Sequence, residues 1–138
     1  NMAISIQQQD IRFKLKQSNT IKAWIKKIIV LEKKKCGQLN FVFTNDETLL
    51  KTNIEFLKHN TYTDIITFDY CEGSVINGDV LISVERVEEN AKKFKTSFDE
   101  ELKRVMIHGV LHLCGYMDKT KKDIATIRKK EASALARF

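Results

Sequence analysis

The chain has 138 residues, which is enough for one domain with its own hydrophobic core and too few for two. Hydrophobic residues make up 43% and charged residues 30% of the chain, which is typical of a globular protein. No apolar run is long enough to span a membrane. The formal net charge of +6 favours an anionic partner, of which nucleic acid is the usual one.

The first elements are predicted to be a strand, a helix and a second strand. Hydrophobic and charged residues alternate over 11–15, which indicates a strand with one buried face. A hydrophobic stripe of helical period occupies 21–28, and this helix is expected to end by Gly37. Alternation returns over 39–43 and predicts the second strand.

A short helix and a pair of strands are expected next. Thr44 and Glu47 have the spacing of a capping box, which predicts a helix that continues to Leu57. The stretches 64–70 (D-I-I-T-F-D-Y) and 79–83 (D-V-L-I-S) read as two strands. The glycine-containing segment between them, 72–78, predicts that they pair in antiparallel fashion.

The second half is predicted to be helical. One helix covers 84–94, and a capping box at Ser97 and Glu100 opens the next. That second helix is apolar almost all round over 102–113, so we expect it to be the central one. Thr120 is placed to cap a last helix. The prediction is therefore a single mixed α/β (α+β) domain over 1–138, with about four strands and about five helices.

The run H-G-V-L-H-L-C-G-Y-M-D, from His108 to Asp118, is the most informative part of the sequence. His108 and His112 are four residues apart, which on a helix places both imidazoles on one face. Gly115 can end the helix and turn the chain, because glycine takes up a left-handed conformation without steric cost. Asp118 would then return as a third metal ligand and leave a fourth position open, as in catalytic zinc sites. Two histidines at helical spacing are also common as satisfied polar groups on a buried helix.

These offsets match the metal frame of the zinc-peptidase motif H-E-x-x-H-x-x-G-x-x-H, with one important difference. The residue after the first histidine of that motif is the glutamate that removes a proton from the metal-bound water. Here that residue is Gly109, which has no proton to exchange. A small metallopeptidase-like hydrolase is therefore an alternative function, but the motif does not supply the general base that such an enzyme needs.

At these residues the chain resembles the YbeY family of bacterial endoribonucleases, whose signature is H-G-x-L-H-L-x-G-Y-D-H. The residues that match in place are His108, Gly109, Leu111, His112, Leu113, Gly115 and Tyr116. The stretch Thr63–Phe68 (T-D-I-I-T-F) is similar to the family's T-D-V-L-S-F, and Gly78–Asp79 to its G-D. The resemblance extends over roughly 41–120.

The resemblance implies a function and a set of partners. It implies a single-strand-specific endoribonuclease with one zinc per chain, of which His108 and His112 are ligands. It also implies maturation of the 3′ end of 16S rRNA in the small ribosomal subunit, and ribosome quality control. A ribosome-associated RNA-binding module that uses its metal only for folding is a second alternative.

Two departures from the family pattern concern the site. The third ligand is the carboxylate of Asp118 where the family has histidine, and this loosens the preference for zinc over harder divalent metals. The family's arginine before the T-D stretch aligns with Leu57. Lys58 and His59 are the nearest residues able to contact a phosphate or protonate a leaving oxygen, although His59 also fits an exposed loop histidine. Lys119 is a candidate contact for the RNA.

The expected reaction is zinc-assisted hydrolysis of a phosphodiester, in which the metal polarises the phosphate and makes a bound water more acidic. Either that water or the RNA 2′-hydroxyl is the nucleophile. The three cysteines form no C-x-x-C pair, and no signal peptide is visible, so a cytoplasmic location is expected. Asn1, which precedes Met2, is expected to be a tag remnant.

Overall fold

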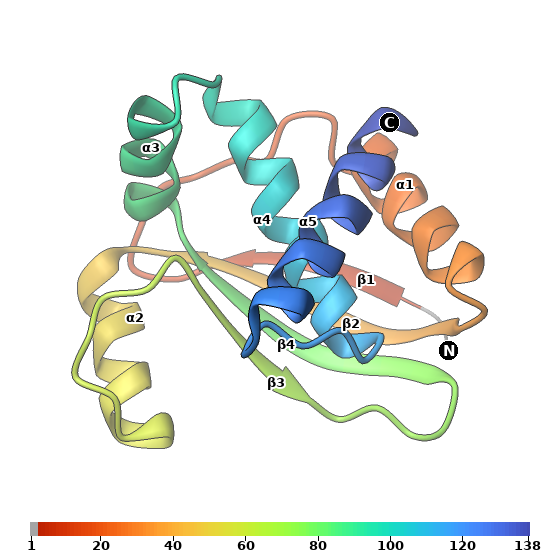
Figure 1. Cartoon of the computed structure of the whole chain (residues 1–138). Helices are drawn as coiled ribbons and strands as arrows, with labels where there is room; N and C mark the ends of the chain where they lie inside the picture. Colours follow the sequence, from red (N-terminus) through yellow and green to blue (C-terminus); the bar gives the residue numbers. More distant parts are fainter. Residues whose placement is uncertain (1–2) are drawn as a thin grey trace.

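A four-stranded mixed sheet forms the base of the fold, with strand order β1-β2-β4-β3 (Figure 1). The computed structural model describes residues 3–138, and the expected tag remnant Asn1 lies outside them. The elements, in chain order, are β1 (Ala3–Gln8), α1 (Ser18–Leu31), β2 (Lys35–Thr44), α2 (Asp46–Thr52), the π-helical turn η1 (Asn53–Leu57), β3 (Ile65–Asp69), β4 (Val75–Ser83), α3 (Val84–Lys93), α4 (Phe98–Leu113) and α5 (Lys121–Ala136).

Strands β1, β2 and β4 run parallel, whereas β3 pairs with β4 in the antiparallel direction. The predicted antiparallel pair is therefore confirmed, as is the mixed α/β domain with four strands and five helices. Strand β4 begins at Val75, earlier than the predicted residue 79. Gly78, assigned to the connecting segment by the sequence, thus lies inside the strand and opposite Asp69.

The first predicted strand is wrong. Residues 11–15 lie outside the sheet, and the edge strand is instead β1, at Ala3–Gln8. The alternation over 11–15 still has a physical cause, because Leu15 is buried and the Phe13 ring packs 4.9 Å from that of Phe43. The segment buries every second side chain against the core without pairing in the sheet, so periodicity alone does not identify it.

The predicted capping box at Thr44 and Glu47 is also wrong. Asn45 caps α2, since its side chain accepts a hydrogen bond from the amide of Thr48. Thr44 ends β2, and its hydroxyl donates to the carbonyl of Gln9. The helix does reach Leu57, as predicted, but its last five residues form the π-helical turn η1.

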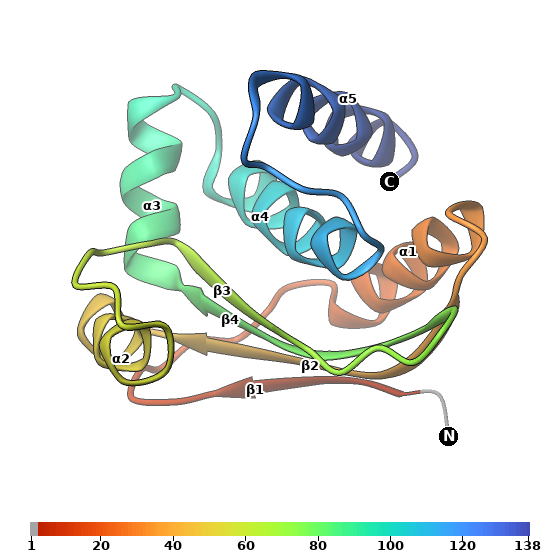
Figure 2. The same cartoon turned by 60° about the horizontal axis from the view of Figure 1, so that its bottom comes forward.

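Helices α1, α3 and α4 cover one face of the sheet, and α5 packs over α4 as a further layer (Figure 2). Helix α4 is central, as predicted: it contacts β3, β4, α1, α3 and α5. Its buried side chains belong to the same core cluster as those of β2 and α1. The largest wholly buried side chains of that core include Phe41 and Phe43 from β2, Ile25 from α1, and Met106 and Ile107 from α4. Each contributes roughly 1.5–3 kcal/mol through burial, and Met106 and Ile107 thereby hold the helix that carries both histidines against the core. Across residues 3–138 no helix combines the length and the hydrophobicity needed to cross a membrane.

Candidate metal centre

The last turns of α4 bring the two histidines of the motif together on one face. The Nε2 atoms of His108 and His112 lie 2.8 Å apart. Asp118 Oδ2 lies 3.2 Å from His112 Nε2 and 3.9 Å from His108 Nε2. One ligand atom from each of the three residues falls within 4.8 Å of the others, so the three residues predicted as metal ligands converge on one point.

A tight turn after α4 returns Asp118 to the histidines. Gly115 has φ +109°, a conformation that side chains rarely adopt. Its amide donates to the carbonyl of His112, and the Tyr116 amide donates to that of Leu111, which is the hydrogen-bond pattern of a Schellman motif. The predicted role of Gly115 is therefore confirmed, and α4 ends where the sequence placed its end.

The second nitrogen of each imidazole is held by another part of the chain. His108 Nδ1 lies 2.5 Å from Glu131 Oε2 on α5, and His112 Nδ1 lies 2.8 Å from the carbonyl oxygen of Tyr116. Both partners are acceptors, so each Nδ1 carries the proton and each Nε2 presents a lone pair. Metal-binding histidines are oriented in this way by a carboxylate or carbonyl behind the ring.

The donor set fits a divalent cation. With both Nδ1 atoms protonated, two Nε2 lone pairs and the Asp118 carboxylate face one another without a hydrogen-bond donor between them. Such an arrangement is repulsive by itself and is relieved by a positive charge placed among the three atoms. Two imidazoles and one carboxylate are ligands that zinc accepts, as do other first-row divalent metals.

Glu131 is a residue of the candidate site that the sequence did not predict. Its side chain is 2% exposed and also accepts a hydrogen bond from Arg104, which in turn binds the buried Glu101. Burial alone would raise the pKa of the Glu131 carboxyl, but the hydrogen bond from His108, together with the charge and hydrogen bond of Arg104, outweighs burial and holds it below its ordinary value. A signal existed in the sequence: Glu131 falls on the buried stripe of α5 between Ile127 and Ala134, where a lone carboxylate needs a partner.

Gly109 faces the sheet and not the metal centre. A Cβ atom at this position would lie 2.9 Å from Ile65 Cδ1 and 2.9 Å from Val80 Cγ1, closer than carbon atoms pack. The glutamate of the zinc-peptidase motif therefore has no room here. The packing of α4 on β3 and β4 explains why glycine follows the first histidine, and it argues against the peptidase alternative.

A cavity of about 450 Å³ is lined in part by the three candidate ligands. Its opposite wall is formed by η1 and the segment that leads into β3, and includes Leu57, His59 and Asp64. Burial raises the pKa of the Asp64 carboxyl, against the lowering effect of the Arg104 charge. No lysine or arginine is found among the described residues that line this cavity.

The three other candidate residues are placed differently. His59 lines the cavity and is also exposed, so both of its predicted descriptions apply. Lys58, in a left-handed conformation at the end of η1, is exposed and does not line the cavity. Lys119 is exposed beside Asp118 and does not line it either. Their roles in catalysis and RNA binding stay predictions.

Comparison with known proteins agrees with this geometry. Residues 3–138 match the sequence profile described as "Endoribonuclease YbeY". A protein of that name from Flavobacterium johnsoniae is 49% identical over 129 residues, which cover 94% of this chain and 93% of the relative. One from Bacteroides fragilis is 42% identical over 135 residues, covering 98% and 97%. The solution structure of a Thermotoga maritima protein superposes with a TM-score of 0.66 at 26% identity, covering 98% of this chain and 91% of that one. The chain belongs to the endoribonuclease YbeY family of metal-dependent RNA hydrolases.

Proposed function

We propose that the chain is a single-strand-specific endoribonuclease that holds one zinc ion through His108, His112 and Asp118. The observation that carries the proposal is the convergence of these three donors at the floor of the cavity, with both Nδ1 atoms engaged from behind. The family relationship identifies RNA as the polymer that the site cleaves. By the same relationship we propose the 3′ end of 16S rRNA as the substrate, with a role in ribosome quality control.

Zinc, when bound, would polarise a phosphate oxygen and make a bound water more acidic. The protein residues have separate tasks. Glu131 and the Tyr116 carbonyl keep both Nε2 atoms directed at the metal position, which lowers the cost of organising the site when the metal arrives. Asp64 and His59, on the facing wall, are the groups placed to accept or donate a proton at the phosphate.

The aspartate in the third position changes the properties of the site. Its negative charge reduces the net positive charge of the loaded centre, so the site tolerates harder metals such as Mn²⁺ better than a three-histidine site does. One zinc per chain is the proposed state, with Mn²⁺ as the competing ion.

The proposed partners are single-stranded RNA and the small ribosomal subunit, and the proposed compartment is the cytoplasm. Support for a reducing compartment comes from the cysteines: Cys36, Cys71 and Cys114 are all free. Burial raises the pKa of each thiol, that of Cys114 to about 12 with a further contribution from Glu32. A raised pKa keeps these thiols protonated near neutral pH, and the protonated form is a poor nucleophile.

The test is cleavage of an end-labelled single-stranded RNA that carries the 16S 3′ segment, with the wild type and His112→Ala purified side by side. Metal content is measured on the same samples by inductively coupled plasma mass spectrometry. We expect about one zinc per wild-type chain and cleavage by the wild type alone. The ends of the product decide the nucleophile, since attack by the 2′-hydroxyl leaves a cyclic phosphate and attack by water does not.

Equal cleavage by both proteins would contradict the proposal and point to a contaminating nuclease. Absence of cleavage by a zinc-loaded wild type, on both the single strand and its duplex with a complementary DNA, would also contradict it. In that case the metal would serve folding or RNA binding alone.

A further inference from the structure

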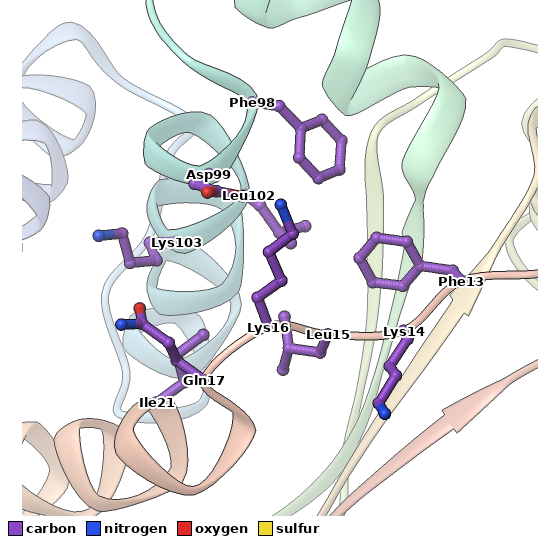
Figure 3. A pocket seen from close by; sticks show the side chains of 10 residues that line it. All are labelled: Phe13, Lys14, Leu15, Lys16, Gln17, Ile21, Phe98, Asp99, Leu102 and Lys103. Atoms are coloured by element: carbon purple, nitrogen blue, oxygen red, sulfur yellow. The ribbon is translucent and has the colours of Figure 1, made fainter.

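A second cavity, of about 330 Å³, lies between the first turns of α4 and the segment that precedes α1 (Figure 3). Its floor is apolar, with the buried side chains of Leu15, Ile21 and Leu102, and Phe13 and Phe98 form an aromatic wall. No residue lines both this cavity and the one at the metal centre. A volume above 300 Å³ with an apolar floor is within the range of small-ligand sites.

Positive charge surrounds this apolar floor. Lys14, Lys16 and Lys103 line the cavity with one carboxylate, that of Asp99. Figure 3 shows the Lys16 side chain extending toward Phe98, whereas Lys14 extends away from it. Within residues 3–138, neither Lys14 nor Lys16 forms an ion pair with a carboxylate. Their charges are therefore available to a ligand.

A neighbouring cavity of about 390 Å³ adjoins the first one along the segment that precedes α1. It shares Phe13, Lys14 and Leu15 with the first cavity and adds Lys22 from α1. We call the two together the Phe13 groove. Its lining contains four lysines and one acidic residue, Asp99.

The cavity at the metal centre itself offers few cations to a polyanion. The cavity over the three ligands is lined by two aspartates and by no described lysine or arginine. RNA carries a negative charge at every nucleotide, and protein cations supply most of the affinity for its backbone. An adjoining cavity of about 180 Å³ is lined by Arg104 and Arg128, of which Arg104 is already engaged with Glu101 and Glu131. Phosphates farther along the strand would need other cations of the protein.

We propose that the Phe13 groove is a second RNA-binding site, which holds one or two nucleotides of the single strand away from the metal centre. The bases contact Phe13 and Phe98, and the phosphates contact Lys14 and Lys16. Aromatic rings beside unpaired cations are the chemistry by which proteins hold single-stranded RNA. The proposal rests on the endoribonuclease activity for the choice of RNA over an acidic peptide.

The test compares two double variants of equal charge in the metal-loaded full chain. Lys14→Gln/Lys16→Gln changes the groove, while Lys26→Gln/Lys27→Gln removes two exposed lysines of α1 that line neither cavity. The probe is a fluorescein-labelled 12-nucleotide 2′-O-methyl oligoadenylate, checked on a gel for integrity after each titration. Its Kd is measured by fluorescence anisotropy over a range of KCl concentrations.

We expect the groove variant to bind at least about fivefold more weakly than the control variant at low salt. Its plot of log affinity against log salt should be shallower by about 1.4, the value for two lost phosphate contacts on a single strand. Phe98→Leu should weaken binding severalfold without changing this slope, because it removes stacking and no charge. A thermal melt of each variant shows whether the fold is intact.

Equal binding by the two double variants would overturn the proposal. So would a groove variant that binds RNA like the control but loses affinity for a 12-residue Asp/Leu peptide. The proposed function fails separately: if the wild type does not cleave RNA but the groove variant loses RNA affinity, the groove assignment stands. If the wild type cleaves and the groove variant binds like its control, only the groove assignment is wrong.

Discussion

Glu131 connects the metal centre to the packing of α5 on α4. Its carboxylate is 2% exposed and bridges His108 and Arg104. Because its pKa lies below the ordinary glutamate value of 4.5, the charged form is favoured in the folded protein. Its contribution to stability is therefore fully present above pH 4.5 and is lost as the pH falls through the lower folded-state pKa.

Glu131→Gln should lower the free energy of unfolding of the metal-free protein by about 2 kcal/mol at pH 7, because it weakens buried charged hydrogen bonds. Urea unfolding in EDTA at pH 7, 5, 4 and 3 measures the difference from wild type. The difference should shrink below pH 4.5 as the wild-type carboxylate is protonated. Glu88→Gln, which removes an exposed pair with Lys92, should cost less than about 0.5 kcal/mol. A gap that stays constant down to pH 3 would contradict this account.

Asp118 is the other residue whose identity matters, since it replaces a histidine of the family signature. Asp118→Ala should weaken zinc binding by at least about tenfold, since it removes one of three proposed ligands. Asp118→His should bind zinc tightly and should prefer zinc over Mn²⁺ more strongly than the wild type does. Competition with a chromogenic zinc chelator measures both. Unchanged zinc affinity in the alanine variant would show that this carboxylate is not a ligand.

At the scale of elements, the turn after α4 determines where Asp118 lies. Gly115→Ala should cost about 1–2 kcal/mol, because φ +109° is unfavourable for a residue with a side chain although no atom lies within 4 Å of the added Cβ. Gly73→Ala in the β3–β4 connection is the matched control, with φ +56° and an equally open position. Both should lower the melting temperature, but zinc affinity should fall in the Gly115 variant alone. A comparable loss of zinc affinity in both variants would show that the turn at Gly115 does not determine zinc binding.

How far the sequence predicted each element depended on whether its signal was local. The Thr120 cap was predictable because capping is local: its side chain accepts a hydrogen bond from the amide of Asp123, three residues away. The reciprocal bond, from the Thr120 amide to the Asp123 side chain, was not predicted. Strand β1 was not predicted, because it has only two large apolar residues, Ile4 and Ile6, and because its pairing with β2 joins residues far apart in the sequence. The three candidate ligands could be predicted as a group because helix period and one turn bring them together. Glu131 was missed because only the docking of α5 brings it to His108, 23 residues away.

At the scale of the whole molecule, the metal centre lies beside the main core and not within it. The largest buried side chains, including Phe41, Phe43 and Met106, join the sheet to α1 and α4. The three candidate ligands are instead only partly buried or exposed, at the end of α4 and in the loop that leads to α5. The fold should therefore persist without metal, with its stability reduced at this end of the molecule.

Removal of the metal tests whether the core is stable independently of the metal centre. Zinc at a thousand times its Kd stabilises a protein by about 4 kcal/mol, and for a domain of this size EDTA should lower the melting temperature by roughly 12 °C. Far-ultraviolet circular dichroism at 25 °C should stay unchanged, because the core is intact. Hydrogen exchange should rise mainly in 114–136, where Asp118 and Glu131 lie, and stay slow in β2 and β4. Loss of the helix signal at 25 °C on adding EDTA would instead show that the whole domain needs the metal in order to fold. An unchanged melting temperature would show that no metal binds in the folded state.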